Sequence, residues 1–201
     1  MKAKLNLLLA GAAMLAAFPL LFSGCASQES ACNKSSCCQA PATTPAVAPA
    51  PAPKTVEPVK IALNFVKADS EETAGEDGKG ANAVDGDNST IWHTQWQDSA
   101  PACPHEIVIE LKPSATIKGF TYLPRQDDSE NGTIKDYEFY VSNDGSDFGQ
   151  PVAKGTFEGG KELKTVNFAP KQCRFIKLKA VSEINDGAWT SAAEIGVVPA
   201  N

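Results

Sequence analysis

Histidine is scarce in this chain of 201 residues, and no arrangement of residues typical of catalysis stands out. There are only two histidines, His93 and His105. No serine or cysteine stands in a setting typical of a nucleophile, and the acidic residues gather on turns. A glycosidase needs two carboxylates placed across a sugar, and the sequence shows no such pair. We therefore expect a protein that is not an enzyme.

Basic residues are outnumbered as well. The chain has 18 Lys and Arg against 24 Asp and Glu, a formal net charge of −6 at pH 7. We therefore expect no nucleic acid partner, because nucleic-acid binding depends on basic surface. An acidic surface also has no basic patch that would attract anionic lipid headgroups. Any contact with a membrane should come through a covalent lipid.

The N-terminus has the layout of a secretory signal. Two lysines in the first four residues precede a largely apolar run from Leu5 to Phe22. The run is nearly as long as the roughly 20 residues of a membrane span, but Pro19 and the small residues Ser23 and Gly24 favour cleavage. We expect residues 1–24 to be a signal peptide.

The segment Leu21-Phe22-Ser23-Gly24-Cys25 resembles a bacterial lipobox. It departs from that pattern because Phe22 stands three places before the cysteine, where leucine is usual. The resemblance implies that Cys25 receives lipid and anchors the exported protein to the cell envelope. Ala26 is not the aspartate that often retains lipoproteins at the inner membrane, so we expect the outer membrane or the cell surface.

A tether is predicted for residues 25–59. Its part from Ala40 to Pro58 is mostly Pro and Ala, a composition that favours extended, disordered chain and cannot bury a core. Cys32, Cys37 and Cys38 lie in this tether. Their spacing does not match a structural zinc site, so a local or intermolecular disulfide is favoured over metal binding.

Residues 60–201 have the size of one domain, and their pattern is that of short strands. Ile107, Ile109 and Leu111 recur at every second position, as do Tyr137 and Phe139. Turn signals separate the strands: Asp85-Gly86, Asn131-Gly132, Asp144-Gly145 and Gly159-Gly160. No long segment keeps a helical apolar stripe. We predict an all-β fold, an antiparallel sandwich or barrel.

Two cysteines lie within this domain, each just before a predicted strand. Cys103 and Cys173 could form a disulfide that bridges two strands, although connectivity cannot be derived from sequence.

The run from Ala81 to Trp92 concentrates carboxylate, amide and hydroxyl oxygens on a turn that contains glycine. Calcium gathers six to eight oxygen ligands of these kinds. An acidic, solvated loop explains the run equally well, so the run by itself leaves both interpretations open.

The domain resembles a known family over residues 62–198. The segments that carry the resemblance are the run Asn82–Trp92, the segment Tyr122–Asp127, the strand and turn Asp136–Gly145, the stretch Arg174–Leu178 and the ending Ala192–Ile195. These look like family 32 carbohydrate-binding modules, which belong with the coagulation factor V/VIII type C, or discoidin, domains. The resemblance implies a jelly-roll β-sandwich of the galactose-binding-like, discoidin fold.

The resemblance also implies a buried structural calcium between an early loop and the C-terminal end. Asp85, Asp87 and Thr90 would supply ligands from the loop, Asn82 and Ala193 would supply backbone carbonyls, and Glu194 would close the site. Such a cation joins residues about a hundred positions apart, so it should stabilise the fold.

A sugar site is implied by a second set of residues. A sugar ring needs an exposed aromatic plate and a few fixed hydrogen-bonding groups. The resemblance implies that His93, Arg125 and Asn131 bond the sugar, that Trp189 stacks on it and that Trp96 forms a second wall. Trp92 is assigned to the core.

Structural roles are the alternatives at several of these positions. Arg125 could simply pair with Asp127 or Asp128, Trp96 could belong to the core, and an acidic loop, longer than usual, could displace Asn131.

We therefore predict a surface-anchored module that binds galactose-type or N-acetylated sugars on glycans or polysaccharide. The alternative is a calcium-stabilised adhesion module that recognises a protein partner and binds no sugar. In that case Trp96, Arg125 and Trp189 need not meet in one pocket.

Overall fold

The structure is a computed structural model that describes residues 61–200. The predicted signal peptide, the lipidation site Cys25 and the tether with Cys32, Cys37 and Cys38 lie outside the described residues. Within 61–200, no helix is long and apolar enough to cross a membrane.

Eight strands and one short 3-10 helix make up the described part of the chain. In chain order they are β1 (Ala62–Ala68), η1 (Gly80–Val84), β2 (Trp92–His93), β3 (His105–Leu123), β4 (Asp136–Ser142), β5 (Ala153–Thr156), β6 (Lys164–Ala180), β7 (Ser191–Ala192) and β8 (Glu194–Pro199). In β3, β4 and the second half of β6, side chains at every second position are buried. Ile107, Ile109 and Leu111 are fully buried, as the period of two predicts.

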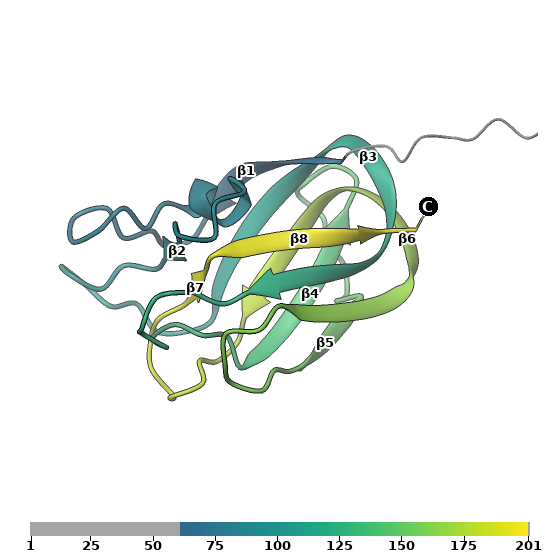
Figure 1. Ribbon diagram of the computed structural model, residues 1–201. Coiled ribbons are helices and arrows are strands. Elements are labelled where there is room, and N and C mark those ends of the chain that lie inside the picture. Colours follow the sequence, from purple (N-terminus) through teal and green to yellow (C-terminus); the bar gives the residue numbers. More distant parts are fainter. Residues whose placement is uncertain (1–60, 201) are drawn as a thin grey trace, which may run out of the picture. The chain divides into compact units, whose positions relative to one another are not determined.

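The long strands β3 and β6 pair with each other and take part in both layers of a sandwich (Figure 1). The first half of β3 pairs with β1, and its second half pairs with β8. The second half of β6 pairs with β4, which pairs with β5. All these pairings are antiparallel, and the pairing of β3 with β6 is interrupted between Glu110 and Ala115, between its two halves. The predicted all-β, antiparallel sandwich is confirmed.

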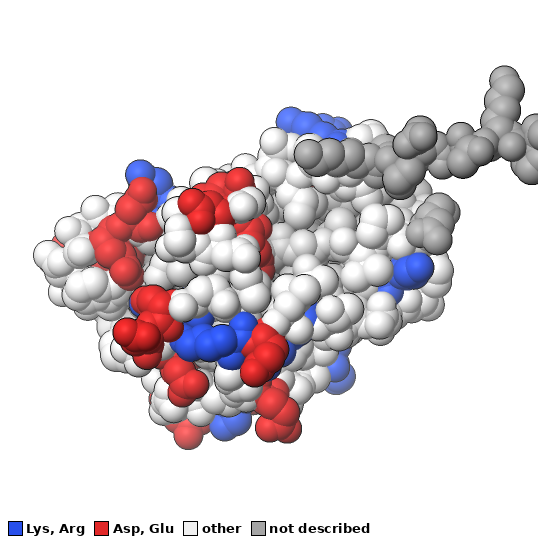
Figure 2. Space-filling model, viewed as in Figure 1, with Lys and Arg blue, Asp and Glu red and all other residues white. Residues whose placement is uncertain are grey.

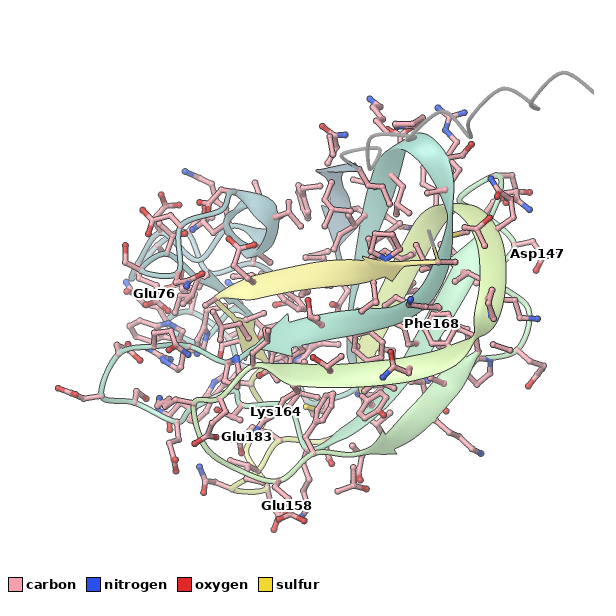
Figure 3. All side chains as sticks on the ribbon, turned by 45° about the vertical axis from the view of Figure 1, so that its right-hand side comes forward. Glu76, Asp147, Glu158, Lys164, Phe168 and Glu183 are labelled. Atoms are coloured by element: carbon pink, nitrogen blue, oxygen red, sulfur yellow. The ribbon has the colours of Figure 1, made fainter. Side chains whose placement is uncertain are left out.

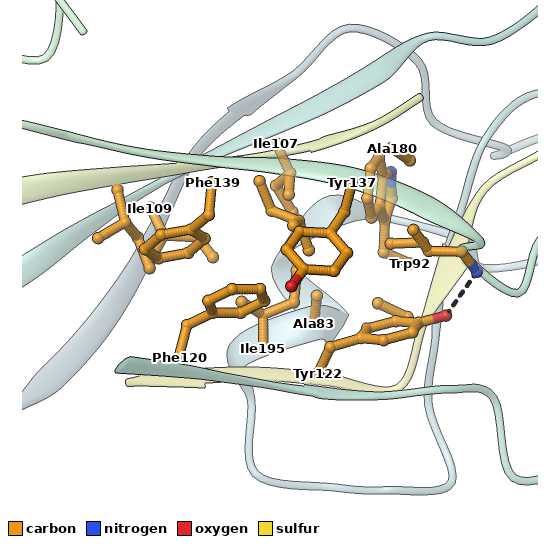
Figure 4. Close-up of a cluster of buried hydrophobic side chains, with 14 of the residues drawn as sticks. Ala83, Trp92, Ile107, Ile109, Phe120, Tyr122, Tyr137, Phe139, Ala180 and Ile195 are labelled. Carbon is orange, nitrogen blue, oxygen red and sulfur yellow. Dashed lines mark hydrogen bonds between the residues drawn. The ribbon is translucent and has the colours of Figure 1, made fainter. Parts of the chain in front are cut away.

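Aromatic side chains from both layers form the core (Figure 4). Phe120 of β3 stacks on Phe139 of β4, with ring centroids 4.1 Å apart. Tyr122 is fully buried, and its hydroxyl donates to Ser191 O and accepts from Ile134 N at 3.0 Å each. Trp92 is also fully buried, which confirms its assignment to the core. This core fixes the strand ends from which the loops of the site emerge.

The predicted disulfide between Cys103 and Cys173 is wrong, because both are free thiols. Cys103 precedes His105, which pairs with Ala180, whereas Cys173 pairs with Ala115. The two cysteines therefore lie at opposite ends of one antiparallel segment. Residues that precede two antiparallel strands always lie at opposite ends of the pair, and the sequence pattern did not show that these strands pair with each other.

The loops that follow β1, β2 and β3 gather at one end of the sandwich, with the segment that precedes β7. Figure 3 shows Glu76 and Glu183 at this end and Asp147 at the opposite end. In Figure 2, acidic side chains concentrate over the loop end of the visible face, whereas the other end is mostly uncharged and its few charged side chains are mainly Lys and Arg. The loop end is where the candidate site lies.

Candidate functional site

One cavity of about 320 Å³ at the loop end brings the five predicted sugar-site residues together. Its lining consists of Glu76, His93, Trp96, Arg125, Ser129, Asn131 and Trp189. Dispersal of Trp96, Arg125 and Trp189 would have favoured protein recognition, and the structure shows that they converge. Their roles toward a ligand stay a prediction, and Glu76 and Ser129 are additions that the sequence did not suggest.

Pairing of β2 with β7 places the two ends of the site side by side. His93 is the register partner of Ser191, two residues after Trp189. Thr94 N donates to Thr190 O at 2.9 Å, and Thr190 N donates to Thr94 Oγ1 at 2.9 Å. Residues almost a hundred positions apart are therefore held together by backbone pairing.

His93 is buried, with 3% of its surface exposed. Its Nδ1 lies 2.6 Å from Thr94 O, and a carbonyl oxygen can only accept, so Nδ1 carries the proton. Burial lowers the pKa of His93, although the Thr94 carbonyl and Glu76 act against this effect. The ring is therefore neutral at pH 7, and its Nε2 is an acceptor. Among the described residues Nε2 has no hydrogen-bond partner, which leaves it for a ligand hydroxyl.

Arg125 enters the cavity from the segment after β3 and is 7% exposed. Its Nε and NH2 groups donate to the two carboxylate oxygens of Asp127, at 2.6 and 2.5 Å. The alternative of an ion pair with Asp127 is thus confirmed, and the hydrogen bond to Asp127 raises the pKa of Arg125. The pair fixes the planar guanidinium, while NH1 points to Asn131 O at 3.3 Å. Arg125 can therefore be both paired and available to a ligand.

Asn131 lies on the rim, held by its backbone. Its carbonyl accepts from Ser191 Oγ at 2.9 Å, and Ser191 N donates to Gly132 O at 2.7 Å. Gly132 has φ +82°, and a Cβ there would lie 2.7 Å from Ser191 N. Only glycine permits this close approach of the turn to β7. The acidic loop therefore does not displace Asn131 from the cavity.

A buried carboxylate positions Trp96. Glu72 is fully buried, and it accepts from the backbone N–H groups of Ala74 and Gly75 and from those of Trp96 and Gln97, at 2.7 to 2.8 Å. These bonds, with that from Gly75 first, lower the pKa of Glu72 to about 2. Trp96 is 40% exposed, and its Nε1 donates to Glu76 Oε1 at 2.9 Å. Glu72 thus ties the loop after β1 to the loop that presents the Trp96 ring.

A second buried carboxylate does the same for Trp189. Glu183 is 2% exposed. Its Oε2 accepts from Asn185 N and Gly187 N, both at 2.8 Å, and its Oε1 accepts from Gly132 N at 3.2 Å. The half-buried Trp189 follows this turn, and its indole Nε1 has no partner among the described residues. Glu183 therefore holds the Trp189 loop against the Gly132 turn.

His105 gives further support to the Trp189 loop. Its Nδ1 lies 2.8 Å from Asp69 Oδ2, and its Nε2 lies 3.0 Å from Ala188 O. Burial lowers the pKa of His105, but the hydrogen bond and charge of Asp69 outweigh burial and raise it.

Sequence reasoning missed the two buried glutamates, Glu72 and Glu183, because buried Glu is rare. The only signal for Glu183 is the turn-forming run Asn185-Asp186-Gly187 after it, whose N–H groups need an acceptor.

The predicted calcium ligands meet at a neighbouring loop. Glu194, the first residue of β8, accepts from Gly86 N at 2.7 Å. Thr90 Oγ1 donates to Asp85 Oδ2 at 2.8 Å and lies 2.9 Å from Asp87 O. Burial raises the pKa of Glu194, and the nearby Asp85 raises it further. The loop therefore carries negative charge that, within 61–200, no lysine or arginine pairs with.

The remaining two predicted ligands, Asn82 and Ala193, lie close in sequence to the other predicted ligands. No contact of their backbone carbonyls supports or contradicts the prediction. Asn82 lies in η1, and its Nδ2 donates to Asp77 O and Ile91 O. Ala193 lies between β7 and β8, beside Glu194. Across the described residues, no three His, Cys, Asp or Glu side chains form a metal-binding group. The predicted set fits that finding only if carbonyl and hydroxyl oxygens supply several of its ligands, as calcium allows.

The chain is similar in sequence to a known domain family and to parts of known enzymes. Residues 66–195 match the F5/8 type C domain family. Galactose oxidase of Gibberella zeae is 39% identical over 137 residues, which cover 68% of this chain and 20% of the oxidase. The sialidase of Micromonospora viridifaciens is 39% identical over 136 residues, covering 67% of this chain and 21% of the sialidase. The chain thus spans about a fifth of the length of these relatives.

Two solved structures from Clostridium perfringens are similar over nearly their whole length. CpGH89CBM32-5, in complex with GalNAc-β-1,3-galactose, is 36% identical with a TM-score of 0.62, covering 68% of this chain and 94% of that one. The family 32 CBM from NanJ, in complex with galactose, is 31% identical with a TM-score of 0.58, covering 67% and 92%.

Proposed function

Because the chain belongs to the F5/8 type C domain family, we propose that its β-sandwich is a non-catalytic module that binds galactose-type or N-acetylated sugars. The observation that carries the proposal is the convergence of His93, Trp96, Arg125, Asn131 and Trp189 in one cavity. The two solved relatives in complex with galactose and with GalNAc-β-1,3-galactose support it. Catalysis in the oxidase and the sialidase gives no reason to expect an enzyme, since the chain matches only about a fifth of each.

Binding combines an apolar contact with directed hydrogen bonds. Trp189 stacks on the C–H face of the sugar, and Trp96 bounds the ring from a second side. His93 Nε2 accepts from a ligand hydroxyl, and Arg125 donates to a ligand oxygen. One aromatic plate and a few polar contacts give an affinity of about −4 to −8 kcal/mol, which corresponds to millimolar to micromolar dissociation constants.

A structural calcium is the second part of the proposal. Asp85, Asp87, Thr90 and Glu194 would hold the ion with the carbonyls of Asn82 and Ala193. The support is the meeting of Glu194 with the loop at Gly86, 108 positions earlier in the chain. The ion would neutralise the carboxylates and join η1 and its loop to β8, so its role is stability rather than chemistry.

The third part concerns location. Export, lipidation at Cys25 and a tether over residues 25–59 would hold the module away from the envelope, where it can reach glycans or polysaccharide. The support is the sequence of the N-terminus alone. Expression of the Cys25→Ala variant should release the protein from the membrane fraction, and retention there would contradict lipid anchoring.

A glycan array with the full chain, with and without chelator, tests the binding function, followed by calorimetry on each hit. Arg125→Ala should abolish binding, whereas Arg174→Ala, at an exposed arginine paired with Glu110, should leave it unchanged. Silence across the array from folded protein with calcium present would contradict the proposal and favour the protein-recognition alternative.

A further inference from the structure

A second cavity adjoins the cavity lined by His93, Arg125 and Trp189, which is called the sugar cavity below. Its volume is about 290 Å³, and Glu76 lines both cavities. It lies between the Glu76–Asp77 loop, the segment Ser89–Ile91 and the residues Gln126 and Asp127. Asp127 is also the partner of Arg125 in the first cavity. Each cavity is at the small end of the range for ligand sites, about 300 to 1,000 Å³, so one longer ligand could fill both.

The groups that this second cavity offers to a ligand are mainly acceptors. Gln126 Nε2 donates to Pro124 O at 2.7 Å and to Lys161 O at 2.9 Å. Asn82 Nδ2 donates to Asp77 O at 2.7 Å and to Ile91 O at 3.0 Å. Both amides therefore spend their N–H groups on backbone carbonyls, which fixes their orientation and leaves their oxygens for a ligand.

Three carboxylates also line this cavity, those of Glu76, Asp77 and Asp127. Both oxygens of Asp127 accept from Arg125, and Glu76 Oε1 accepts from Trp96 Nε1. Asp77 belongs to the lining, and its side chain is 68% exposed. It pairs at 3.0 Å with Lys79, which lies outside the lining. No lysine or arginine belongs to the described lining of this cavity. The cavity thus favours hydroxyl and ammonium donors and disfavours an anionic group.

We propose that the second cavity binds the next residue of a glycan whose terminal sugar occupies the first cavity, and that it selects a neutral or amine-bearing residue over an acidic one. This inference rests on the proposed function and deepens it, because it names the class of glycan. One further net hydrogen bond corresponds to an affinity about threefold to tenfold above that for the single sugar.

Calorimetry with the full chain and four ligands tests the inference. The ligands are galactose, lactose, lactosamine with a free amine, and the disaccharide of galactose with glucuronic acid in the same linkage. Lactose and lactosamine should bind about threefold to tenfold tighter than galactose, and the glucuronic acid disaccharide no tighter than galactose.

Charge variants isolate the second cavity. Asp77→Lys should leave the dissociation constant for galactose unchanged and remove the discrimination against the acidic disaccharide. Asp77→Asn should weaken that discrimination. The control Asp147→Lys, at the opposite end of the sandwich (Figure 3), should change neither quantity.

The outcomes are distinct. If wild-type protein binds galactose but binds all three disaccharides with the same affinity as galactose, the second subsite is refuted and the proposed function stands. An unchanged order of ligands in Asp77→Lys would refute the charge selection. If wild-type protein binds no galactose, the proposed function itself fails.

Discussion

Carboxylates play opposite roles in two regions of the loop end. Under the sugar cavity, Glu72 and Glu183 are buried, and each accepts several hydrogen bonds from backbone N–H groups of neighbouring turns. In the loop after η1, Asp85 and Glu194 lie near each other, and burial together with Asp85 raises the pKa of Glu194. In the first region, the partial positive charges of backbone N–H groups balance the negative charge of each carboxylate. The second region concentrates negative charge.

The difference indicates which part of the site the chain organises alone. A carboxylate saturated by N–H donors fixes the loops around it without help from a ligand. The carboxylates of the second region also accept backbone N–H bonds, such as that from Gly86 N to Glu194, but they repel one another, so an external cation would stabilise them further. We therefore expect the sugar cavity to be formed by the protein itself, and the calcium loop to be completed by the ion.

Removing a buried acceptor should have the largest effect. Glu183→Ala leaves several backbone N–H groups without an acceptor, so it should lower the free energy of unfolding by about 2–4 kcal/mol and weaken sugar binding. Chemical denaturation with calorimetry on the folded fraction measures both. The control Glu158→Ala removes an exposed carboxylate (Figure 3) and should change stability by less than about 0.5 kcal/mol. Equal stability of the two variants would show that Glu183 does not organise the loop.

Acid should weaken the same region through Glu72. Because the folded pKa of about 2 lies below the ordinary 4.5, the stabilisation by Glu72 is present above pH 4.5 and is lost as pH falls towards 2. Glu72→Gln should be less stable at pH 7, and its stability should fall less than that of wild type between pH 4.5 and 2. Parallel pH profiles of the two proteins would contradict the assignment.

Calcium should stabilise the second region. At a free concentration a hundred times its dissociation constant, the ion should raise the free energy of unfolding by about 2.7 kcal/mol. Glu194→Ala should remove most of this gain, whereas Glu158→Ala should keep it. Thermal unfolding with calcium and with chelator measures the difference. An equal response of the two variants would place any bound calcium elsewhere.

Loss of the stacking surface should affect affinity more than stability. Trp189→Ala should weaken galactose binding by about tenfold, since an aromatic contact contributes about 0.5–1.5 kcal/mol beyond its area. Leu163→Ala, at an apolar side chain that is 56% exposed, is the control and should bind normally. Unchanged affinity of Trp189→Ala in calorimetry would refute the stacking role.

The sequence predicted the fold and the position of the cavity, but not what supports the cavity. The recurrence of apolar residues at every second position around Ile109 identified strands, because one face of each strand is buried. The four turn signals were also correct, because each contains a glycine with positive φ, such as Gly132. Five of the residues that line the cavity followed from resemblance to a family, but Glu76 and Ser129 did not. Glu72 and Glu183 could not be found, since only the folded chain brings the distant N–H groups to them. The disulfide prediction failed for the same reason, because strand pairing between β3 and β6 decides where Cys103 and Cys173 lie.

The three tryptophans allow the most direct test of the central claim, that the cavity binds sugar. Their indole N–H signals can be followed by NMR during titration with galactose and assigned with single Trp→Phe variants. Trp96 and Trp189 line the cavity, whereas Trp92 is buried in the core and donates to Ser70 O at 2.9 Å. Binding in the cavity predicts that the signals of Trp96 and Trp189 shift with one dissociation constant while that of Trp92 stays in place. Three unchanged signals, at galactose concentrations well above the millimolar range, would contradict the account.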